Sequence, residues 1–280
     1  MYNVFFNYQF KDIVNSKQMK IHKNIAAAFQ FLTILPLPVK TERRHLEKSM
    51  VWFPLVGAVI GVITGFAYQG LYAVFPASIS SALTILIYII LTRALHLDGF
   101  MDTIDGFFSY QDRESILKIM KVPTLGSFAV LGVGVWFLVL FSSLPMLGSK
   151  DYIIIHTYVR TAILLMPLLF TYPRESGTGK FFVDHVKDKT ALLAIILTLM
   201  ITAALYFIDI PGSQWTVNKR LQILVYGAFL LVSFFVSWLI GLWSKKKIGG
   251  ITGDIVGFTI ETTHLFLVLL IALTFKISHG

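Results

Sequence analysis

The sequence predicts an all-α, polytopic integral membrane protein: a bundle of about seven transmembrane helices with an N-terminal interfacial or re-entrant helix. Of its 280 residues, 56% are hydrophobic and only 14% are charged, whereas soluble domains carry about 25% charged residues. The mean hydropathy is +0.73. Several apolar runs exceed the roughly 18 residues of a membrane-spanning helix, and they are continuous rather than alternating as in a barrel strand. A soluble enzyme is therefore excluded, and an outer-membrane barrel is disfavoured.

The apolar runs predict spans in order along the chain. They lie near residues 51–74, 79–97, 127–147, 152–172, 190–210, 222–243 and 255–275. The apolar segment Ile25–Val39 is short and ends in two prolines, so we expect an interfacial or re-entrant helix rather than a span. Residues 1–23 form an N-terminal extension, and residues 24–280 form a single membrane-embedded catalytic domain.

The net charge of +9 predicts membrane topology rather than nucleic-acid binding. One set of loops holds most of the Lys and Arg residues, and the opposite set holds only Lys150, Lys219, Arg220 and Lys276. The positive-inside rule places the basic set in the cytoplasm. We therefore expect a multi-pass protein of the cell (inner) membrane that contacts membrane lipid and no nucleic acid. The sequence leaves a homo-oligomer open.

Three aspartates follow the second predicted span, in the stretch HLDGFMDTIDGF. Asp98, Asp102 and Asp105 are spaced i, i+4 and i+7, so on a helix they share one face within about 60°. Carboxylates this close repel one another unless a cation neutralises them. The chain has no cysteine, so its metal ligands must be oxygen or imidazole, and oxygen donors favour Mg²⁺ or Mn²⁺. A solvated acidic helix end is the alternative, but the rest of this helix is apolar.

A second acidic pair lies in GGITGDIVGFTIE, near the C-terminus. Asp254 and Glu261 are seven residues apart and share a helix face. Gly253 belongs to a glycine-containing turn before them, and such turns can bind phosphate at a helix N-terminus, although the signal alone is weak. Nearly all the conspicuous polar motifs fall on the side that the basic loops mark as cytoplasmic, which favours one site built from several helix ends.

Four cations stand near these motifs. Arg174 and Lys180 flank a short glycine-containing stretch suited to a pyrophosphate, which lacks the spacing of a P-loop. Arg160 lies inside a predicted span and should face the bundle interior and an acid. For Arg160 and Arg93 a structural ion pair and a phosphate contact are both open. The residues thus specify metal-assisted phosphoryl or phosphodiester transfer at the cytoplasmic face, without naming the acceptor.

The motifs resemble those of the cobalamin synthase family, the adenosylcobinamide-GDP ribazoletransferases. Residues 96–106 resemble the family's HLDGxxDTxDG, and residues 250–261 its GGxTGDxxGAxxE. Weaker matches, in chain order, are FLTILPLP from Phe31, FPLVG from Phe53, IMK from Ile119 and YPR from Tyr172. Val122 and His264 stand where the family often has acids, which leaves any role for those two positions in doubt.

The resemblance implies a Mg²⁺-dependent transferase of the last steps of cobalamin biosynthesis. The family joins adenosylcobinamide-GDP to α-ribazole, or to its 5′-phosphate, and releases GMP: the ribose 3′-hydroxyl attacks the phosphorus next to cobinamide. We expect Asp98, Asp102 and Asp105 to bind Mg²⁺ and His96 to act as the base. Asp254 and Glu261 would hold a second cation or orient the hydroxyl. Arg174, Lys180, Arg93, Arg160 and Gly253 would bind substrate.

Two other functions fit parts of the sequence. A CDP-alcohol phosphotransferase of phospholipid synthesis also uses helix-borne aspartates and Mg²⁺, but its second motif, GxxxDxxxD, is absent. A small-solute transporter would place acids near the bilayer centre, whereas these acids cluster at predicted helix ends.

Overall fold

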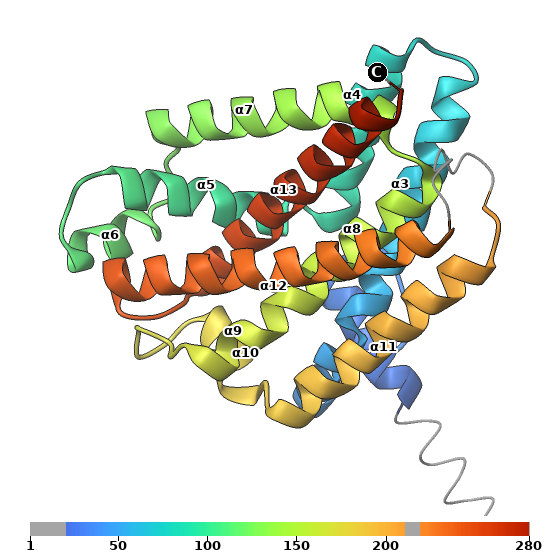
Figure 1. Cartoon of the computed structure of the whole chain (residues 1–280). Helices are drawn as coiled ribbons and strands as arrows, with labels where there is room; N and C mark the ends of the chain where they lie inside the picture. Colours follow the sequence, from blue (N-terminus) through green and yellow to red (C-terminus); the bar gives the residue numbers. More distant parts are fainter. Residues whose placement is uncertain (1–20, 211–218, 280) are drawn as a thin grey trace, which may run out of the picture.

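The computed structural model describes residues 21–210 and 219–279, and within them every regular element is helical (Figure 1). The predicted all-α membrane bundle is therefore confirmed. Most of the predicted extension, residues 1–20, lies outside the described residues. A helix covers residues 21–32, and an extended segment leads from it to α2 (Arg43–Ser49).

Within the described residues, six helical stretches are long and apolar enough to cross a membrane, or seven if one bent pair is a single span. The first joins α2, η1 (Met50–Trp52) and α3 (Phe53–Tyr72), and the second joins α7 (Ser127–Ser143) and η2 (Leu144–Met146). The third joins α8 (Ser149–Ala162), η3 (Ile163–Leu165) and α9 (Met166–Leu169). The last three are α11 (Asp188–Phe207), α12 (Lys219–Ile248) and α13 (Gly253–His279). The helix over residues 21–32 is not among them, as predicted.

The bent pair is the main departure from the predicted spans. A continuous helix was predicted over residues 79–97, but α4 (Ala77–Thr92) ends early and α5 (Leu95–Phe108) leaves it at 95°. Arg93 and Ala94 between them have φ angles of 55° and 53°, a left-handed conformation that is uncommon without glycine. Arg93 donates from Nη2 to the carbonyls of Gln30 and Phe31, at 3.2 and 2.7 Å. The bend is thus held by the N-terminal segment.

Two close helix pairs form the core. α3 packs along α8, and α5 packs along α13. A Cβ on Gly61 of α3 would come within 2.5 Å of the Ile153 Cα. The absence of a side chain at Gly61 therefore lets the α8 backbone pack closely against α3. Every residue of α8 is buried. α13 contacts α5, α7, α8 and α12, which places it at the centre of the bundle (Figure 1).

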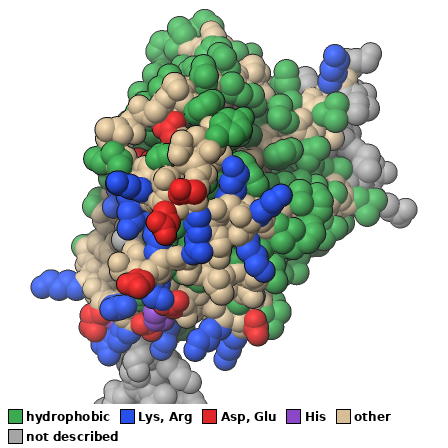
Figure 2. All heavy atoms as spheres, turned by 90° about the vertical axis from the view of Figure 1, so that its left-hand side faces the viewer, with side chains coloured by type: hydrophobic (Ala, Val, Ile, Leu, Met, Phe, Trp, Pro, Cys, Tyr) green, Lys and Arg blue, Asp and Glu red, His purple; other side chains and the backbone are tan. Residues whose placement is uncertain are grey.

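Two short helices lie at the end of the bundle where α5 ends and α13 begins. α6 (Arg113–Ile119) is capped by Asp112, whose carboxylate accepts a hydrogen bond from the Ser115 N–H at 2.8 Å. Hydrogen bonding from Ser115 lowers the pKa of the Asp112 carboxyl. α10 (Thr178–His185) precedes α11. Figure 2 shows Lys, Arg, Asp and Glu side chains gathered over this end of the molecule, with hydrophobic side chains above and beside them.

Candidate active site

The crossing of α5 and α13 is set by two glycines. A Cβ on Gly99 would lie 2.8 Å from the Asp254 Cα, and one on Gly257 would lie 2.8 Å from the His96 carbonyl oxygen. Each substitution would force the two backbones apart. The first turn of α13 therefore lies directly against the first turns of α5, and Asp254 stands beside Asp98.

Three acids at this crossing lie close enough for their charges to act on one another. Asp98 is exposed, Asp102 is half-buried, and the Asp254 side chain is 27% exposed. After burial, the negative charges of Asp98 and Asp254 act most strongly on Asp102, followed by that of Asp105. Arg174 supplies positive charge, with Nη1 at 3.7 Å from Oδ2 of Asp254. Several carboxylates thus share one guanidinium, an arrangement that attracts cations.

Asp105 faces away from this group, toward the start of α7. Its Oδ2 accepts the Gly126 N–H at 2.6 Å, and its Oδ1 accepts the Ala129 N–H at 2.8 Å. Both carboxylate oxygens are therefore engaged by the N-terminus of α7, where N–H groups otherwise lack partners. The three aspartates share a helix face as predicted, but the third caps a neighbouring helix.

The donor chemistry of the remaining acids suits Mg²⁺. Among the described residues no group of three or more His, Asp or Glu side chains is placed so that the group could hold a metal ion. Mg²⁺ is usually held by one or two carboxylates together with substrate phosphates and water, so a complete protein cage is not required. One or two of the Asp98, Asp102 and Asp254 carboxylates, completed by substrate phosphates and water, would fit that pattern.

Arg174 and Lys180 differ in their surroundings. Arg174 is largely buried and donates from Nη2 to the Leu117 carbonyl at 3.1 Å, while its Nε has no hydrogen-bond partner among the described residues. Lys180 pairs with Asp184 at 3.1 Å near solvent. Burial raises the pKa of the Tyr172 hydroxyl between them, and the positive charges of both cations oppose that rise. Arg174 therefore joins the acidic group, and Lys180 lies at its edge.

Gly253 lies where α10 meets α13. A Cβ on Gly179 would overlap the Gly253 backbone, whereas a Cβ on Gly253 would lie 3.5 Å from the Gly179 Cα, an ordinary contact. The turn before it is held by the Ile251 N–H, which donates to the Thr171 carbonyl at 2.9 Å. The loop that bears Arg174 is thereby fixed against the start of α13.

Glu261 belongs to a different, fully buried cluster. Its two oxygens accept hydrogen bonds from the Tyr88 hydroxyl at 2.7 Å and the Trp136 Nε1 at 3.0 Å. The His264 ring lies 3.8 Å away. Seven residues of helix put Glu261 about 10 Å along the axis from Asp254. The structure therefore separates the two acids, Asp254 and Glu261, that were predicted to hold a second cation or to orient the hydroxyl.

Arg160 belongs to the same cluster and is fully buried, which confirms its predicted position in the bundle interior. Its Nη1 lies 3.1 Å from the His156 carbonyl, and its Nε and Nη2 have no hydrogen-bond partner among the described residues. The charge of Glu261 acts on it, as expected for an acid nearby. His96 stands between this cluster and the acidic group: its side chain is 5% exposed, and its Nδ1 has no partner among the described residues.

A cavity of about 290 Å³ opens beside the acids. Asp98, Asp254 and His96 line one side. Phe31, Phe53 and Phe182 line the other, and they come from three separate elements. The Phe53 ring stacks on Phe31 at 6.0 Å and on Phe182 at 6.2 Å, nearly parallel to both. Sequence reasoning missed this wall, because nothing distinguishes these phenylalanines from the chain's other apolar residues.

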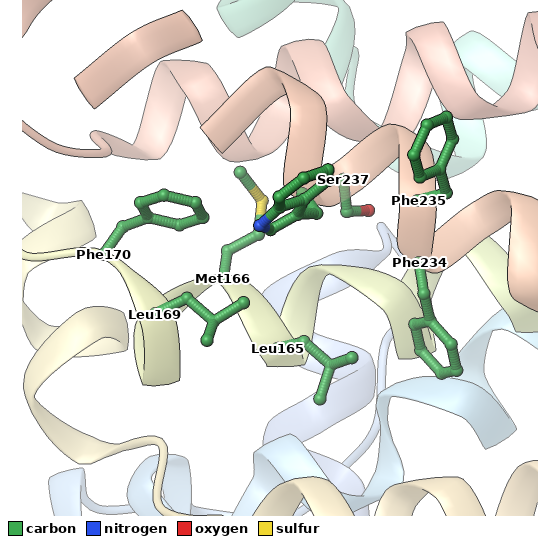
Figure 3. A pocket seen from close by; sticks show the side chains of 8 residues that line it. Leu165, Met166, Leu169, Phe170, Phe234, Phe235 and Ser237 are labelled. Carbon is green, nitrogen blue, oxygen red and sulfur yellow. The ribbon is translucent and has the colours of Figure 1, made fainter. Parts of the chain in front are cut away.

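A second cavity, of about 260 Å³, lies between α9 and α12 (Figure 3). Its labelled side chains are apolar except for Ser237, whose hydroxyl already donates to the Ser233 carbonyl at 2.9 Å. Leu169 and Phe235 beside it are each more than half exposed. With no charged group in its wall, it offers no chemistry of its own.

Comparison with known proteins gives consistent matches. The model of the family described as cobalamin-5-phosphate synthase matches residues 24–272. An adenosylcobinamide-GDP ribazoletransferase of Chlorobaculum parvum is 35% identical over 258 residues, covering 90% of this chain and 96% of the relative. Those of Fusobacterium nucleatum and Clostridium tetani are 33% and 30% identical, covering 89% and 90% of this chain and 96% of each relative. No solved structure matches the chain.

Proposed function

The chain belongs to the cobalamin-5-phosphate synthase family, with adenosylcobinamide-GDP ribazoletransferase activity in cobalamin biosynthesis, and we propose that the reaction takes place at Asp98, Asp102 and Asp254. The observation that carries this proposal is the meeting of these acids with Arg174 beside a cavity. The two other functions considered from the sequence, phospholipid synthesis and solute transport, are set aside.

We propose that Asp98, Asp102 and Asp254 are the residues whose carboxylates would hold Mg²⁺ when adenosylcobinamide-GDP is bound. When bound, the metal would neutralise charge on the diphosphate and on the departing phosphate. Asp105 is then a positioning residue: it fixes the start of α7 against α5 through the N–H groups of Gly126 and Ala129.

The proposed reaction is a substitution at phosphorus. A ribose hydroxyl oxygen of the ribazole forms a bond to the phosphorus next to cobinamide, and the bond from that phosphorus to the GMP oxygen breaks. The hydroxyl proton passes to His96, which lines the cavity and has a free ring nitrogen among the described contacts. GMP leaves with the bonding electron pair.

The cations have separate tasks in this proposal. Arg174, held by the Leu117 carbonyl and Asp254, offsets charge on the transferred phosphate. Lys180 and the backbone at Gly253 lie at the outer edge, where the GMP phosphate would depart. Arg160 and Glu261, buried in their own cluster, support the helices from inside and touch neither substrate.

We also propose that this end of the molecule faces the cytoplasm. Its loops carry most of the basic residues, as the positive-inside rule requires of cytoplasmic loops. Figure 2 displays the charged side chains gathered over this end of the molecule.

The test is turnover by detergent-purified protein supplied with adenosylcobinamide-GDP, α-ribazole and Mg²⁺. Asp102→Asn should lose at least 1,000-fold in kcat while keeping the melting temperature, because it removes a ligand charge without changing side-chain size. Asp209→Asn, an exposed aspartate beyond the end of α11, is the matched control and should turn over normally. Wild-type rates in Asp102→Asn would refute the proposed site.

A further inference from the structure

The cavity beside the acids has two unlike walls. Asp98, Asp254 and His96 make a polar wall, and the phenylalanine wall of Phe31, Phe53 and Phe182 makes an aromatic one. A ligand that fits both must have a polar end and a flat apolar end. Among the parts of the two substrates, three must be considered: the corrin ring, the guanine and the ribazole.

Size excludes the corrin ring. Cavities for small organic ligands range from about 300 to 1,000 Å³, so a cavity of about 290 Å³ is at the lower limit. It accommodates a nucleoside-sized group and not a macrocycle with its side chains. The corrinoid must therefore lie outside it, with only its diphosphate reaching Asp254.

Chemistry favours the ribazole over guanine. Guanine presents several hydrogen-bonding groups along its edge, and buried polar edges need matching partners. The phenylalanine wall offers none. The ribazole base is a flat aromatic ring system with little hydrogen-bonding demand, and it can continue an array of offset-stacked rings. The existing rings are nearly parallel, with centroids 6.0 and 6.2 Å apart, so they already present such an array.

We propose that this cavity is the α-ribazole subsite, with the base against the phenylalanine wall and the ribose toward Asp98, Asp254 and His96. The inference rests on the proposed function, since it takes the metal and the diphosphate to lie at these acids. The buried His96 Nδ1, which has no partner among the described residues, would gain one from the ribose.

Arg93 acquires a role in the same subsite. Its guanidinium donates to the Phe31 carbonyl at 2.7 Å and so fixes the segment that supplies one ring of the wall. Arg93 itself is exposed and does not line the cavity. It is therefore a positioning residue for the acceptor, not a ligand of the phosphate.

The experiment measures KM separately for the two substrates on the full-length protein in detergent with Mg²⁺. Phe31→Ala should raise KM for α-ribazole at least tenfold, with KM for adenosylcobinamide-GDP within twofold and kcat within threefold of wild type. Arg93→Ala should shift the same KM in the same direction, and Phe31→Leu should shift it less. Phe66→Ala, a 53% exposed phenylalanine of α3 outside the cavity, is the matched control and should change neither constant.

Equilibrium binding of radiolabelled α-ribazole, without the corrinoid, is the second measurement. Asp102→Asn should bind it with wild-type Kd although it does not turn over, and Phe31→Ala should bind at least tenfold more weakly. An unchanged Kd in Phe31→Ala, or a rise in KM for the corrinoid substrate instead, would overturn the subsite and assign the cavity to guanine. Turnover by Asp102→Asn would instead refute the proposed function, so the two failures are distinct.

Discussion

Two roles can be distinguished for Asp105 of the aspartate motif. It was predicted to be a metal ligand, and the structure shows it capping a helix. The structure gives its carboxylate two hydrogen bonds from backbone N–H groups, at 2.6 Å from Gly126 and 2.8 Å from Ala129. A hydrogen bond to a charged group contributes about 1.5–3 kcal/mol. Asp105→Asn keeps one acceptor oxygen and should cost about 2 kcal/mol, and Asp105→Ala loses both and should cost about 4 kcal/mol.

These costs translate into measurable melting shifts. At about 2–4 °C per kcal/mol, Asp105→Asn should melt about 4–8 °C below wild type and Asp105→Ala about twice as far below. Turnover of Asp105→Asn, measured well under its melting temperature, should stay within fivefold of wild type, with an unchanged Mg²⁺ requirement. Thermal unfolding followed by intrinsic fluorescence, together with a Mg²⁺ titration of GMP release, provides both readings.

The control is Asp112→Asn, since Asp112 caps α6 through one hydrogen bond from Ser115 and lies at the exposed surface. It should lose about 1 kcal/mol of stability and no activity. The reasoning would be refuted if Asp105→Asn melted like wild type and yet lost turnover as completely as Asp102→Asn. That result would make Asp105 a ligand of the metal.

Three further outcomes follow from the described contacts. Glu261→Ala leaves two buried donors without acceptors, at a cost of about 1–3 kcal/mol each, so it should lower the melting temperature by more than 4 °C. Glu261→Gln should lower it by less. A melting temperature of Glu261→Ala equal to that of wild type would contradict the buried cluster. Gly179→Ala should destabilise the protein and Gly253→Ala should not, because only the first added methyl group overlaps backbone; thermal unfolding of both checks this. Removing divalent cations with EDTA should abolish GMP release, and Mg²⁺ or Mn²⁺ should restore it; undiminished release in EDTA would exclude a metal-dependent site.

The spans were predictable because hydropathy along the chain is a local property. The bend between α4 and α5 was not, since Arg93 and Ala94 include neither the glycine nor the proline that usually marks such a break. What holds the bend is a pair of carbonyls more than sixty residues earlier in the chain. Sequence spacing cannot report that contact.

The same limit explains the candidate site. Helical spacing correctly put Asp98, Asp102 and Asp105 on one face, but it could not tell that the third carboxylate would meet the start of α7. Likewise the seven-residue spacing of Asp254 and Glu261 could not show that their environments differ. Asp254 lies at the open end of the bundle, and Glu261 lies in its interior. The pairing of Asp254 with Asp98 depends on two glycines that let α5 and α13 touch.

The burial of α8 bears on how the chain enters the membrane. Its stretch, Ser149–Leu169, has the lowest mean hydropathy of the six candidate spans, 1.5, and the largest buried share, 78%. Lys150, Asp151 and Arg160 all lie on it, and a charged residue at the centre of an inserting helix costs about 2.5–3.5 kcal/mol. A segment of this kind is poorly retained by lipid alone. We expect it to partition into the bilayer only against the earlier-synthesised α3. We expect its polar side chains to be shielded fully only when the later-synthesised α13 packs against it.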